Sequence, residues 1–528
     1  MDTKALRQKI LDLAIRGKLV PQEPNDEPAE VLLERIREQK QQMFKEGKLK
    51  KKDIKNDTII FKGEDNLHYE KFQDGTVKCI EDEIPFEVPE GWAWCKLNDI
   101  YNFIDYRGAT PTKITNGIPL VTAKNVKSGY IDYTIDDYIS EEEFKERQQR
   151  GISKKGDILF TTEAPLGNAA LADMEKFSAG QRLITFQQYG SKNELINYVM
   201  LMFILSDFFQ QQLYVNKTGS TVAGIKAAIL KTLWIPVPPY NEQLRISNTL
   251  KSAINLIDSI SKNKEILSTS ISNTKSKILD LAIRGKIVPQ DPNDEPASVL
   301  LERIRAEKEE LIKQGKIKRD KKESVIFKGD DNSYYVKIGD KIRCIDAEIP
   351  FDLPELWTFA RLKHIGGIVG GGTPKTNIGK YWDGNIPWLT PADLSGYDSM
   401  YISTGSRTIT DFGLKSSSAQ MLPANSILYS SRAPIGYTAI ATNPVCTNQG
   451  FKSVVPYDFS ISPYLYYSLK ARTDNIIQRA TGTTFKEISG SEMAETIIPI
   501  PPLNEQSKIV EKVTQLQEVI SLIEKSLN

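Results

Sequence analysis

Hydrophobic residues recur at helical spacing through the middle of the chain, from residue 241 to residue 284. Asn241 opens this segment as a helix start would, and Gly285 followed by Pro289 closes it. The pattern predicts one helix of roughly 65 Å. Its stripe needs a partner, and helices from the two ends of the chain would supply an antiparallel coiled coil. The residues on one heptad frame are Leu250, Ile254, Ile257, Ile271 and Ile278.

The chain repeats itself. The stretch 10–40 returns at 278–308 with 26 of 31 positions identical, and shorter matches follow in the same order. They pair 59–66 with 325–332, 83–92 with 348–357, and 235–246 with 498–509. The helical pieces at the two ends together nearly equal the central segment in length. The repeat is therefore predicted to be a two-unit ring opened inside one helix, with the N- and C-terminal helices side by side or end to end.

Other elements follow from local signals. The repeated PNDEPA predicts a further helix, with Asp26 as its N-cap and Pro28 in the first turn, copied at Asp294 and Pro296. β-forming runs around GED and DGT turns predict a small meander at 59–80, copied at 325–345. The regions 98–234 and 363–497 barely resemble each other, but both mix short strands with amphipathic helices.

The expected fold class is α+β. Two α/β modules are separated by long antiparallel coiled-coil helices in a circular, pseudo-two-fold repeat. Five regions are expected: an N-terminal helical repeat (1–55), a first module with its meander (56–240), a central helical spacer (241–322), a second module with its meander (323–503), and a C-terminal helix that pairs with the other helices (504–528).

Composition narrows the class. The 528 residues predict two to four domains, and 40% apolar and 26% charged residues are typical of a globular protein. No apolar run is long enough to span a bilayer, and the N-terminus has no signal-peptide core. Four widely spaced cysteines and two histidines indicate a reducing cytoplasm and disfavour metal or histidine chemistry. The net charge of +1 leaves nucleic-acid binding open, because only clustered charge matters.

Two motifs resemble enzyme signatures without completing them. IPVPPY (235–240) is close to the NPPY of adenine methyltransferases, but Val237 replaces the asparagine and the copy ends in leucine. A strand that ends at prolines before a helix is the better interpretation. GGIVGGGTPKT (366–376) lacks the ending of a phosphate-binding loop, so we expect a flexible loop. No catalytic triad, carboxylate pair or metal cluster emerges.

Polar and cationic residues gather where strands meet loops in the two modules. Arginine and lysine suit guanine edges, asparagine and glutamine suit adenine, and the hydroxyl residues and lysine also hold phosphates. For each residue an ordinary exposed loop position remains the alternative. The candidates are Arg107, Lys113, Thr122, Lys124, Asn125, Lys127, Gln181, Arg182, Ser220, Thr221 and Lys226 in the first module, and Thr373, Lys375, Thr376, Arg432, Asn448, Gln449, Lys452, Thr483, Thr484 and Lys486 in the second.

The whole arrangement resembles the specificity subunits of type I restriction–modification enzymes. The resemblance rests on the doubled IRGK[LI]VPQ, the doubled IP[VI]PP[YL]NEQ, the EIPFEVPEGW segment and the two-fold layout. It implies two target recognition domains that each read half of a split, asymmetric DNA site. It also implies helices that set the spacer and dock two modification (adenine methyltransferase) subunits, through which restriction subunits join.

The resemblance further implies a non-catalytic chain without cofactors, with S-adenosylmethionine, ATP and magnesium on the partner subunits only. Two alternatives stay open. One is a self-contained DNA methyltransferase or nuclease, which the incomplete motifs disfavour. The other is a tandem scaffold that binds proteins only.

Overall fold

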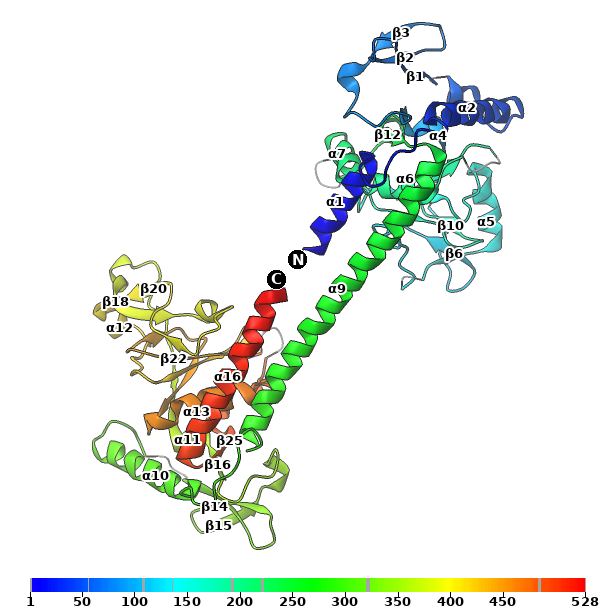
Figure 1. The fold of residues 1–528 in the computed structure, drawn as a ribbon. Helices are drawn as coiled ribbons and strands as arrows, with labels where there is room; N and C mark the ends of the chain where they lie inside the picture. Colours follow the sequence, from blue (N-terminus) through cyan, green and yellow to red (C-terminus); the bar gives the residue numbers. More distant parts are fainter. Residues whose placement is uncertain are drawn as a thin grey trace. The chain divides into compact units, whose positions relative to one another are not determined.

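The chain folds into two units of nearly equal size. A computed structural model describes residues 2–55, 57–106, 110–134, 136–190, 194–219, 223–319, 323–482 and 486–527. Unit 1 is Met1–Lys264 and unit 2 is Glu265–Asn528 (Figure 1). The five predicted regions therefore fall into two bodies, and the division between them lies inside the central helix.

Unit 1 begins with helices α1 (Thr3–Ile15), α2 (Ala29–Lys45) and α3 (Lys51–Ile54), then the meander β1 (Ile59–Lys62), β2 (His68–Lys71) and β3 (Val77–Cys79). The module then comprises β4 (Ala93–Lys96), α4 (Leu97–Ile100), β5 (Tyr101–Asp105), β6 (Ile118–Val121), β7 (Tyr138–Ile139), α5 (Glu141–Arg147), β8 (Ile158–Thr161), β9 (Ala169–Leu171), β10 (Ser178–Ala179), β11 (Leu183–Gln188), α6 (Asn197–Ile204), α7 (Asp207–Val215), α8 (Ala227–Leu230) and β12 (Trp234–Val237). The predicted meander and the predicted strands of this module are confirmed.

Unit 2 repeats this order after helix α9 (Tyr240–Ile283). It contains α10 (Ala297–Lys313), β13 (Ser324–Lys328), β14 (Tyr334–Ile338), β15 (Lys341–Cys344), β16 (Thr358–Arg361), α11 (Leu362–Ile365), β17 (Gly366–Gly370), β18 (Trp382–Leu389), β19 (Tyr401–Ile402), β20 (Arg407–Ile409), α12 (Asp411–Lys415), β21 (Ile427–Ser431), β22 (Ile435–Ala441), β23 (Cys446–Thr447), β24 (Lys452–Pro456), α13 (Ser462–Ala471), α14 (Thr473–Arg479), α15 (Gly490–Ala494), β25 (Ile497–Ile500) and α16 (Leu503–Leu527).

The two modules share one topology although their sequences diverge. The sheet order β5-β11-β8-β9 in unit 1 corresponds to β17-β24-β21-β22-β19 in unit 2. The sheet β10-β6-β7 corresponds to β23-β18-β20, and β6 pairs parallel with β10 as β18 does with β23. Strands β4 and β12 pair antiparallel, as do β16 and β25. The inference that one α/β module is used twice is therefore confirmed.

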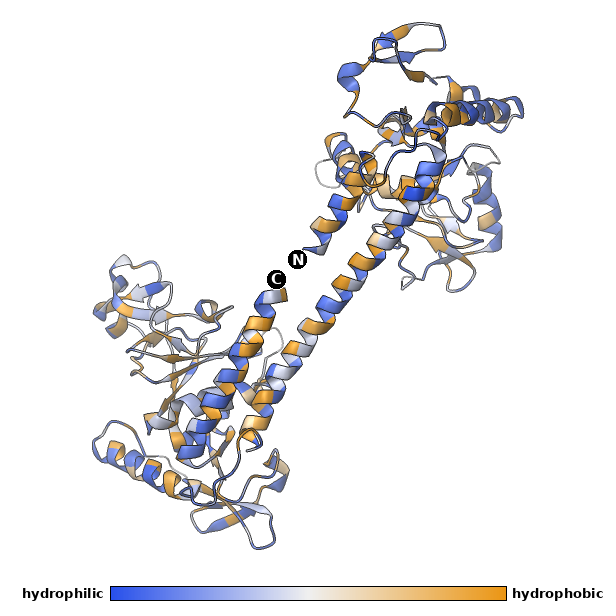
Figure 2. Ribbon diagram, in the orientation of Figure 1, coloured by the Kyte–Doolittle hydropathy of each residue, from blue (hydrophilic) through white to orange (hydrophobic). Residues whose placement is uncertain are grey.

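Helix α9 is a single helix of 44 residues, and its predicted stripe is buried. Hydropathy alternates along it in Figure 2. In unit 1 its first part contacts α1, with the Thr3 and Ser261 hydroxyls 2.8 Å apart. In unit 2 its last part contacts α16, where Lys275 pairs with Glu524 at 2.7 Å. Among the described residues, no helix is apolar enough over a sufficient length to cross a membrane.

A buried glutamate connects the repeated segments of unit 1 by hydrogen bonds. In unit 1 the Glu242 carboxylate accepts the Trp92 indole N–H at 2.9 Å and the Gln22 amide at 3.0 Å. Burial raises the pKa of Glu242 above its usual value. These contacts join three repeated segments, 11–29, 83–92 and 239–245, which we call the joint of unit 1.

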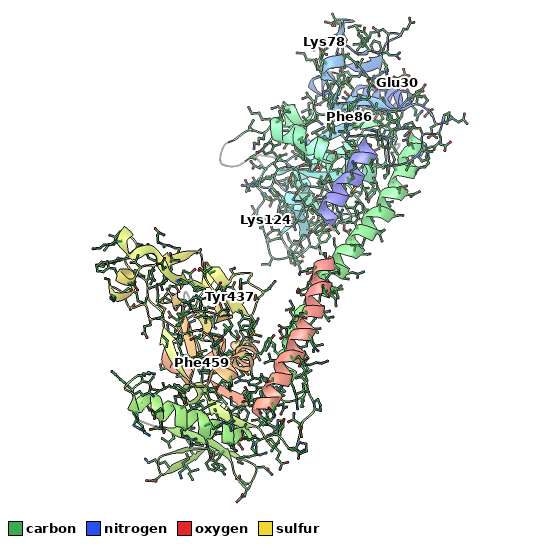
Figure 3. The ribbon with its side chains drawn as sticks, turned by 60° about the vertical axis from the view of Figure 1, so that its left-hand side comes forward. Glu30, Lys78, Phe86, Lys124, Tyr437 and Phe459 are labelled. Carbon is green, nitrogen blue, oxygen red and sulfur yellow. The ribbon has the colours of Figure 1, made fainter. Side chains whose placement is uncertain are left out.

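Arginine and glycine of the repeated IRGK complete this joint. The Arg16 guanidinium lies 4.3 Å from the centre of the Phe86 ring, which is labelled in Figure 3. Gly17 has φ +64°, and a Cβ added there would lie 2.3 Å from Cγ of Pro89. Only glycine combines this backbone conformation with so close an approach.

Unit 2 builds the same joint from 279–297, 348–357 and 501–508. Glu505 accepts the Trp357 indole N–H at 2.8 Å and the Gln290 amide at 2.6 Å. Arg284 lies 4.4 Å from the centre of the Phe351 ring. The repeated sequence is therefore the hydrophobic and hydrogen-bonded connection between the long helix and its module.

The predicted N-caps at Asp26 and Asp294 are wrong. Pro28 and Pro296 hold the N-cap positions of α2 and α10, without a side-chain cap. Asp26 instead pairs with Arg245 at 2.6 Å. Asp294 accepts the Asn504 amide at 3.0 Å. Tertiary partners at the joint thus take the carboxylates that local sequence assigned to the helix ends.

The glycine-rich segment 366–376 is only partly the loop that we expected. Residues Gly366–Gly370 form β17, an edge strand paired with β24. Gly371 follows, and a Cβ there would lie 2.0 Å from the Asn448 carbonyl oxygen. These glycines permit close backbone packing at a sheet edge.

Substituting Gly17 with alanine tests the joint. We expect Gly17→Ala to lower the free energy of unfolding by about 1–3 kcal/mol for the strained backbone, with a further loss from the clash with Pro89. Urea unfolding of the intact chain measures this. Gly47→Ala is the matched control, because Gly47 has φ +73° and an added Cβ would have nothing within 4 Å. Equal losses for both variants would show that the close packing at Pro89 contributes nothing.

Candidate nucleic-acid interface

Several loops of unit 1 meet at one end of the sheet β5-β11-β8-β9. The Thr162 N–H donates to the Arg182 carbonyl at 3.1 Å, and the Ile225 N–H donates to the Thr162 carbonyl at 3.0 Å. The Thr110 hydroxyl donates to the Gln181 side chain at 2.9 Å. Four segments that are distant in sequence therefore form one surface. We define the loop face of unit 1 as Thr110, Glu163, Gln181, Arg182, Gly224 and Lys226.

Unit 2 assembles its loops in the same way. The Ser431 N–H donates to the Gly450 carbonyl at 2.7 Å, and the Ile488 N–H donates to the Ser431 carbonyl at 3.0 Å. The Thr373 hydroxyl donates to the Gln449 side chain. We define the loop face of unit 2 as Thr373, Lys375, Arg432, Gln449, Gly450, Lys452, Lys486 and Glu487.

Most of the predicted DNA-binding residues of unit 2 lie on or beside this face. Thr373, Lys375, Gln449 and Lys486 are exposed, and Arg432 is half-buried. Thr376 follows Lys375 in the same loop, Asn448 precedes Gln449, and Lys452 starts β24. Their contact with DNA stays a prediction. Thr483 and Thr484 lie outside the described residues.

In unit 1 the predicted residues separate into two groups. Gln181, Arg182 and Lys226 belong to the loop face, and Lys113 is exposed in the first loop, where it pairs with Asp137 at 2.6 Å. The other group, Thr122, Lys124, Asn125 and Lys127, forms a separate turn, with Lys124 at the periphery of the unit (Figure 3). Arg107, Ser220 and Thr221 lie outside the described residues.

Asn125, one of the predicted DNA-binding residues, is buried. Only 3% of its surface is exposed, its Oδ1 accepts the Thr122 N–H at 2.9 Å, and its Nδ2 donates to the Asp132 carbonyl at 2.9 Å. Asn125 therefore shapes this turn and does not present its amide on the surface. Local sequence marks asparagine as polar but does not show that a turn encloses it.

Acidic residues that were not among the predicted residues lie on both loop faces. The Glu163 carboxylate pairs with Arg182 at 3.1 Å in unit 1. In unit 2 Glu487 pairs with Lys452 at 3.3 Å and with Arg432 at 3.9 Å. These carboxylates hold cationic side chains at the surface, where they can meet a polyanion. The two glutamates are recognised by their contacts with cations from distant segments, and such contacts are visible in the folded structure but not in the sequence.

An exposed aromatic residue near the loop face of unit 1 was also missed. Tyr214 lies in the last turn of α7, and 69% of its surface is exposed. The Lys217 ammonium lies 3.4 Å from the centre of its ring, and the hydrogen bond from Lys217 lowers the pKa of Tyr214. An aromatic ring beside a lysine offers stacking and charge together, as nucleic acids require.

A groove of about 760 Å³ opens beside the joint of unit 1, away from the loop face. Its lining contains the carboxylates of Glu23, Glu30, Glu87 and Glu90, with Lys62 as a basic member. Negative lining repels phosphate, so this groove does not suit DNA. Among the described residues, no group of three or more histidine, cysteine or acidic side chains is placed to hold a metal ion.

Comparisons with known proteins agree with two repeated units. The family model of the type I restriction modification DNA specificity domain matches residues 89–268 and 354–528. Each match runs from a joint through one module into α9 or α16. A solved structure from work on complex assembly and conformational transition of the type I R-M system superposes with a TM-score of 0.53 at 18% identity. The superposition covers 84% of this chain and 94% of the chain in that structure, which shows a shared fold.

Curated relatives bear related names. The type I restriction enzyme EcoAI specificity subunit of Escherichia coli is 27% identical, with 97% of this chain and 88% of the relative aligned. The type I restriction enzyme MjaIX specificity subunit of Methanocaldococcus jannaschii is 44% identical over 170 residues, which span 32% of this chain and 39% of the relative. Since the family model matches well over half of the 528 residues, in two copies that each cover the module of one structural unit, the chain belongs to the type I restriction modification DNA specificity family.

Proposed function

We propose that this chain is the specificity subunit of a type I restriction–modification complex and that each loop face reads one half of a split, asymmetric DNA site. One observation carries the proposal: a single topology presents the same loop cluster twice, with Glu163 in one copy where the other copy has Arg432. Two different faces call for two different half-sites, so the target should not be a palindrome.

The helices supply the spacer in this proposal. Helix α9 forms an antiparallel coiled coil with α1 in unit 1 and with α16 in unit 2, supported by the buried stripe and the pairs Arg7–Asp258 and Lys275–Glu524. A continuous helix fixes a distance better than a flexible linker does. We also infer that the chain itself is non-catalytic and holds no cofactor.

The two joints are the proposed docking surfaces for partner subunits. Their near-identical sequences would present one docking surface twice, which suits two copies of an adenine methyltransferase subunit. Restriction subunits would join through those copies. S-adenosylmethionine, ATP and magnesium would then belong to the partners.

The direct test uses the chain together with the methyltransferase of its own system. Methylation of a randomised DNA library, read by sequencing, should reveal one bipartite motif with a fixed spacer. The chain alone, given S-adenosylmethionine, should leave DNA unmethylated. Methylation by the chain alone would support the enzyme alternative, and an absence of any bipartite motif or footprint with the partner present would support the protein-only scaffold.

Lys375 provides a test of the loop face in unit 2. We expect Lys375→Ala to weaken binding to all sequences about equally and to reduce the slope of log K against log salt by about 1, because a lysine–phosphate contact releases counterions. Fluorescence anisotropy of the partner complex at several salt concentrations measures this. Lys341→Ala, on the exposed meander strand β15, is the control. Equal slopes for both variants would place Lys375 away from the DNA backbone.

A further inference from the structure

One position that lies at the same place in both loop faces carries opposite charges in the two units. Glu163 follows β8 and Arg432 follows β21 in the same place, each before an Ala-Pro pair whose alanine has φ +43° or +45°. Each position forms a backbone bridge to a second loop, Glu163 to Gly224 and Arg432 to Glu487. Because the backbone is the same, the two units differ here in the side chain that they present.

The residues beside this position also differ between the two units. In unit 1 the carboxylate comes from Glu163 and the cation from Arg182, 3.1 Å away. In unit 2 Gly450 stands where unit 1 has Arg182, and Glu487 stands where unit 1 has Gly224. The guanidinium is therefore supplied from opposite sides of the two loop faces.

Close packing prevents unit 2 from placing an arginine where unit 1 has Arg182. A Cβ added to Gly450 would lie 2.9 Å from Oδ1 of Asn448 and 3.0 Å from Cγ of Pro391, so unit 2 has little room for an arginine there. Arg432 and Glu487 lie 3.9 Å apart, and both side chains remain about two-fifths exposed. The Glu487 carboxylate, which also accepts a hydrogen bond from Lys452 at 3.3 Å, therefore attracts Arg432 without burying it.

The threonine–glutamine pairs provide the contrast. Thr110 with Gln181 and Thr373 with Gln449 occur at the same place in both units. A feature common to both faces cannot account for a difference between two half-sites. The exchanged charges can, because a guanidinium pairs bidentately with guanine O6 and N7, whereas a carboxylate accepts from cytosine N4.

We propose that Arg432, paired with Glu487, is a specificity-determining residue that reads a guanine in the half-site of unit 2. In unit 1 the equivalent role passes to Arg182, held by Glu163 on the other side of the face, so that face selects a different base pair. This inference rests on the proposed function and adds to it which side chains distinguish the two half-sites.

The experiment measures methylation of a randomised bipartite library by the complete complex with its methyltransferase partner. We expect Arg432→Ala to reduce discrimination at one base pair of one half-site by about 5- to 150-fold, the range for a lost bidentate contact. Arg432→Lys should lose nearly as much discrimination, since lysine keeps the charge but not the planar fork. Arg182→Ala should affect one base pair in the other half-site.

In each variant, the half-site read by the unaltered unit serves as the folding control, because it should be selected as before. Retained discrimination in Arg432→Ala, or an equal loss over all sequences with a smaller salt slope, would overturn the inference and assign Arg432 to phosphate or to no contact. If the unaltered complex selects no bipartite site at all, the proposed function itself fails. The two failures are therefore distinct.

Discussion

Replacing residues 98–234 with the matching module of a relative that reads another sequence should change one half of the recognised site and leave the other half unchanged. The two ends of this module are neighbours, since the Asn98 N–H donates to the Lys231 carbonyl at 3.1 Å and the Leu97 N–H to the Leu233 carbonyl at 3.2 Å. A module whose ends meet can be exchanged without displacing the frame.

The expected effect is large. Specific sites are typically bound about 10³–10⁷ times more tightly than other DNA, and each mismatched base pair costs about 1–3 kcal/mol. Loss of an entire half-site motif should therefore make the original site almost indistinguishable from random DNA in methylation. Sequencing of methylated genomic DNA measures the new motif. Exchange of 363–497 is the matched control and should alter the opposite half.

Two results would contradict this prediction. A change in both halves would mean that the modules do not read independently. An unchanged site would place recognition outside residues 98–234. One junction requires care, because the buried Lys40 ammonium donates to the Asn98 carbonyl at 2.9 Å and to Asp57 at 2.7 Å. The incoming module must therefore preserve the backbone at residue 98.

Sequence predicted the frame well because the frame is repeated. The heptad residues from Leu250 to Ile278 are buried as expected, and β12 ends at prolines before α9 as expected. These features depend on local periodicity and on comparison of the chain with itself. The contact between Trp92 and Glu242 joins residues 150 positions apart, so no local pattern could reveal it.

The loop faces were only partly predictable for the same reason. Residue type identified Gln181 and Arg432 as candidates, but it could not separate them from Asn125, which the turn encloses. The acidic partners Glu163 and Glu487 became visible only when the loops came together. Whether any of these residues touches a base or a phosphate stays a prediction that the library experiments decide.

Inserting seven residues into α9 should lengthen the spacer of the recognised site. Residues 262–268 are the place, because α1 contacts α9 up to Ser261 in unit 1 and the buried residue Ile271 lies in the core that contains α16 in unit 2. Seven residues add about 10.5 Å and turn the helix by two nearly complete turns, so the apolar stripe keeps its frame. That length corresponds to about three base pairs of B-DNA.

The rotation of DNA sets the size of the effect. Three additional base pairs rotate the second half-site by roughly 100°, whereas the seven-residue insertion rotates the helix by only about 20°. The variant should therefore lose methylation at the original spacer, prefer a longer one, and bind it more weakly than the unaltered protein binds its own site. Insertion of one residue is the contrasting variant, because it lengthens α9 by only about 1.5 Å but turns its later part by about 100°, so methylation at the original spacer should fall without a clear preference for a longer one. Spacer lengths counted across methylated genomic sites measure both variants, and an unchanged spacer in the seven-residue variant would mean that α9 does not determine the distance between the half-sites.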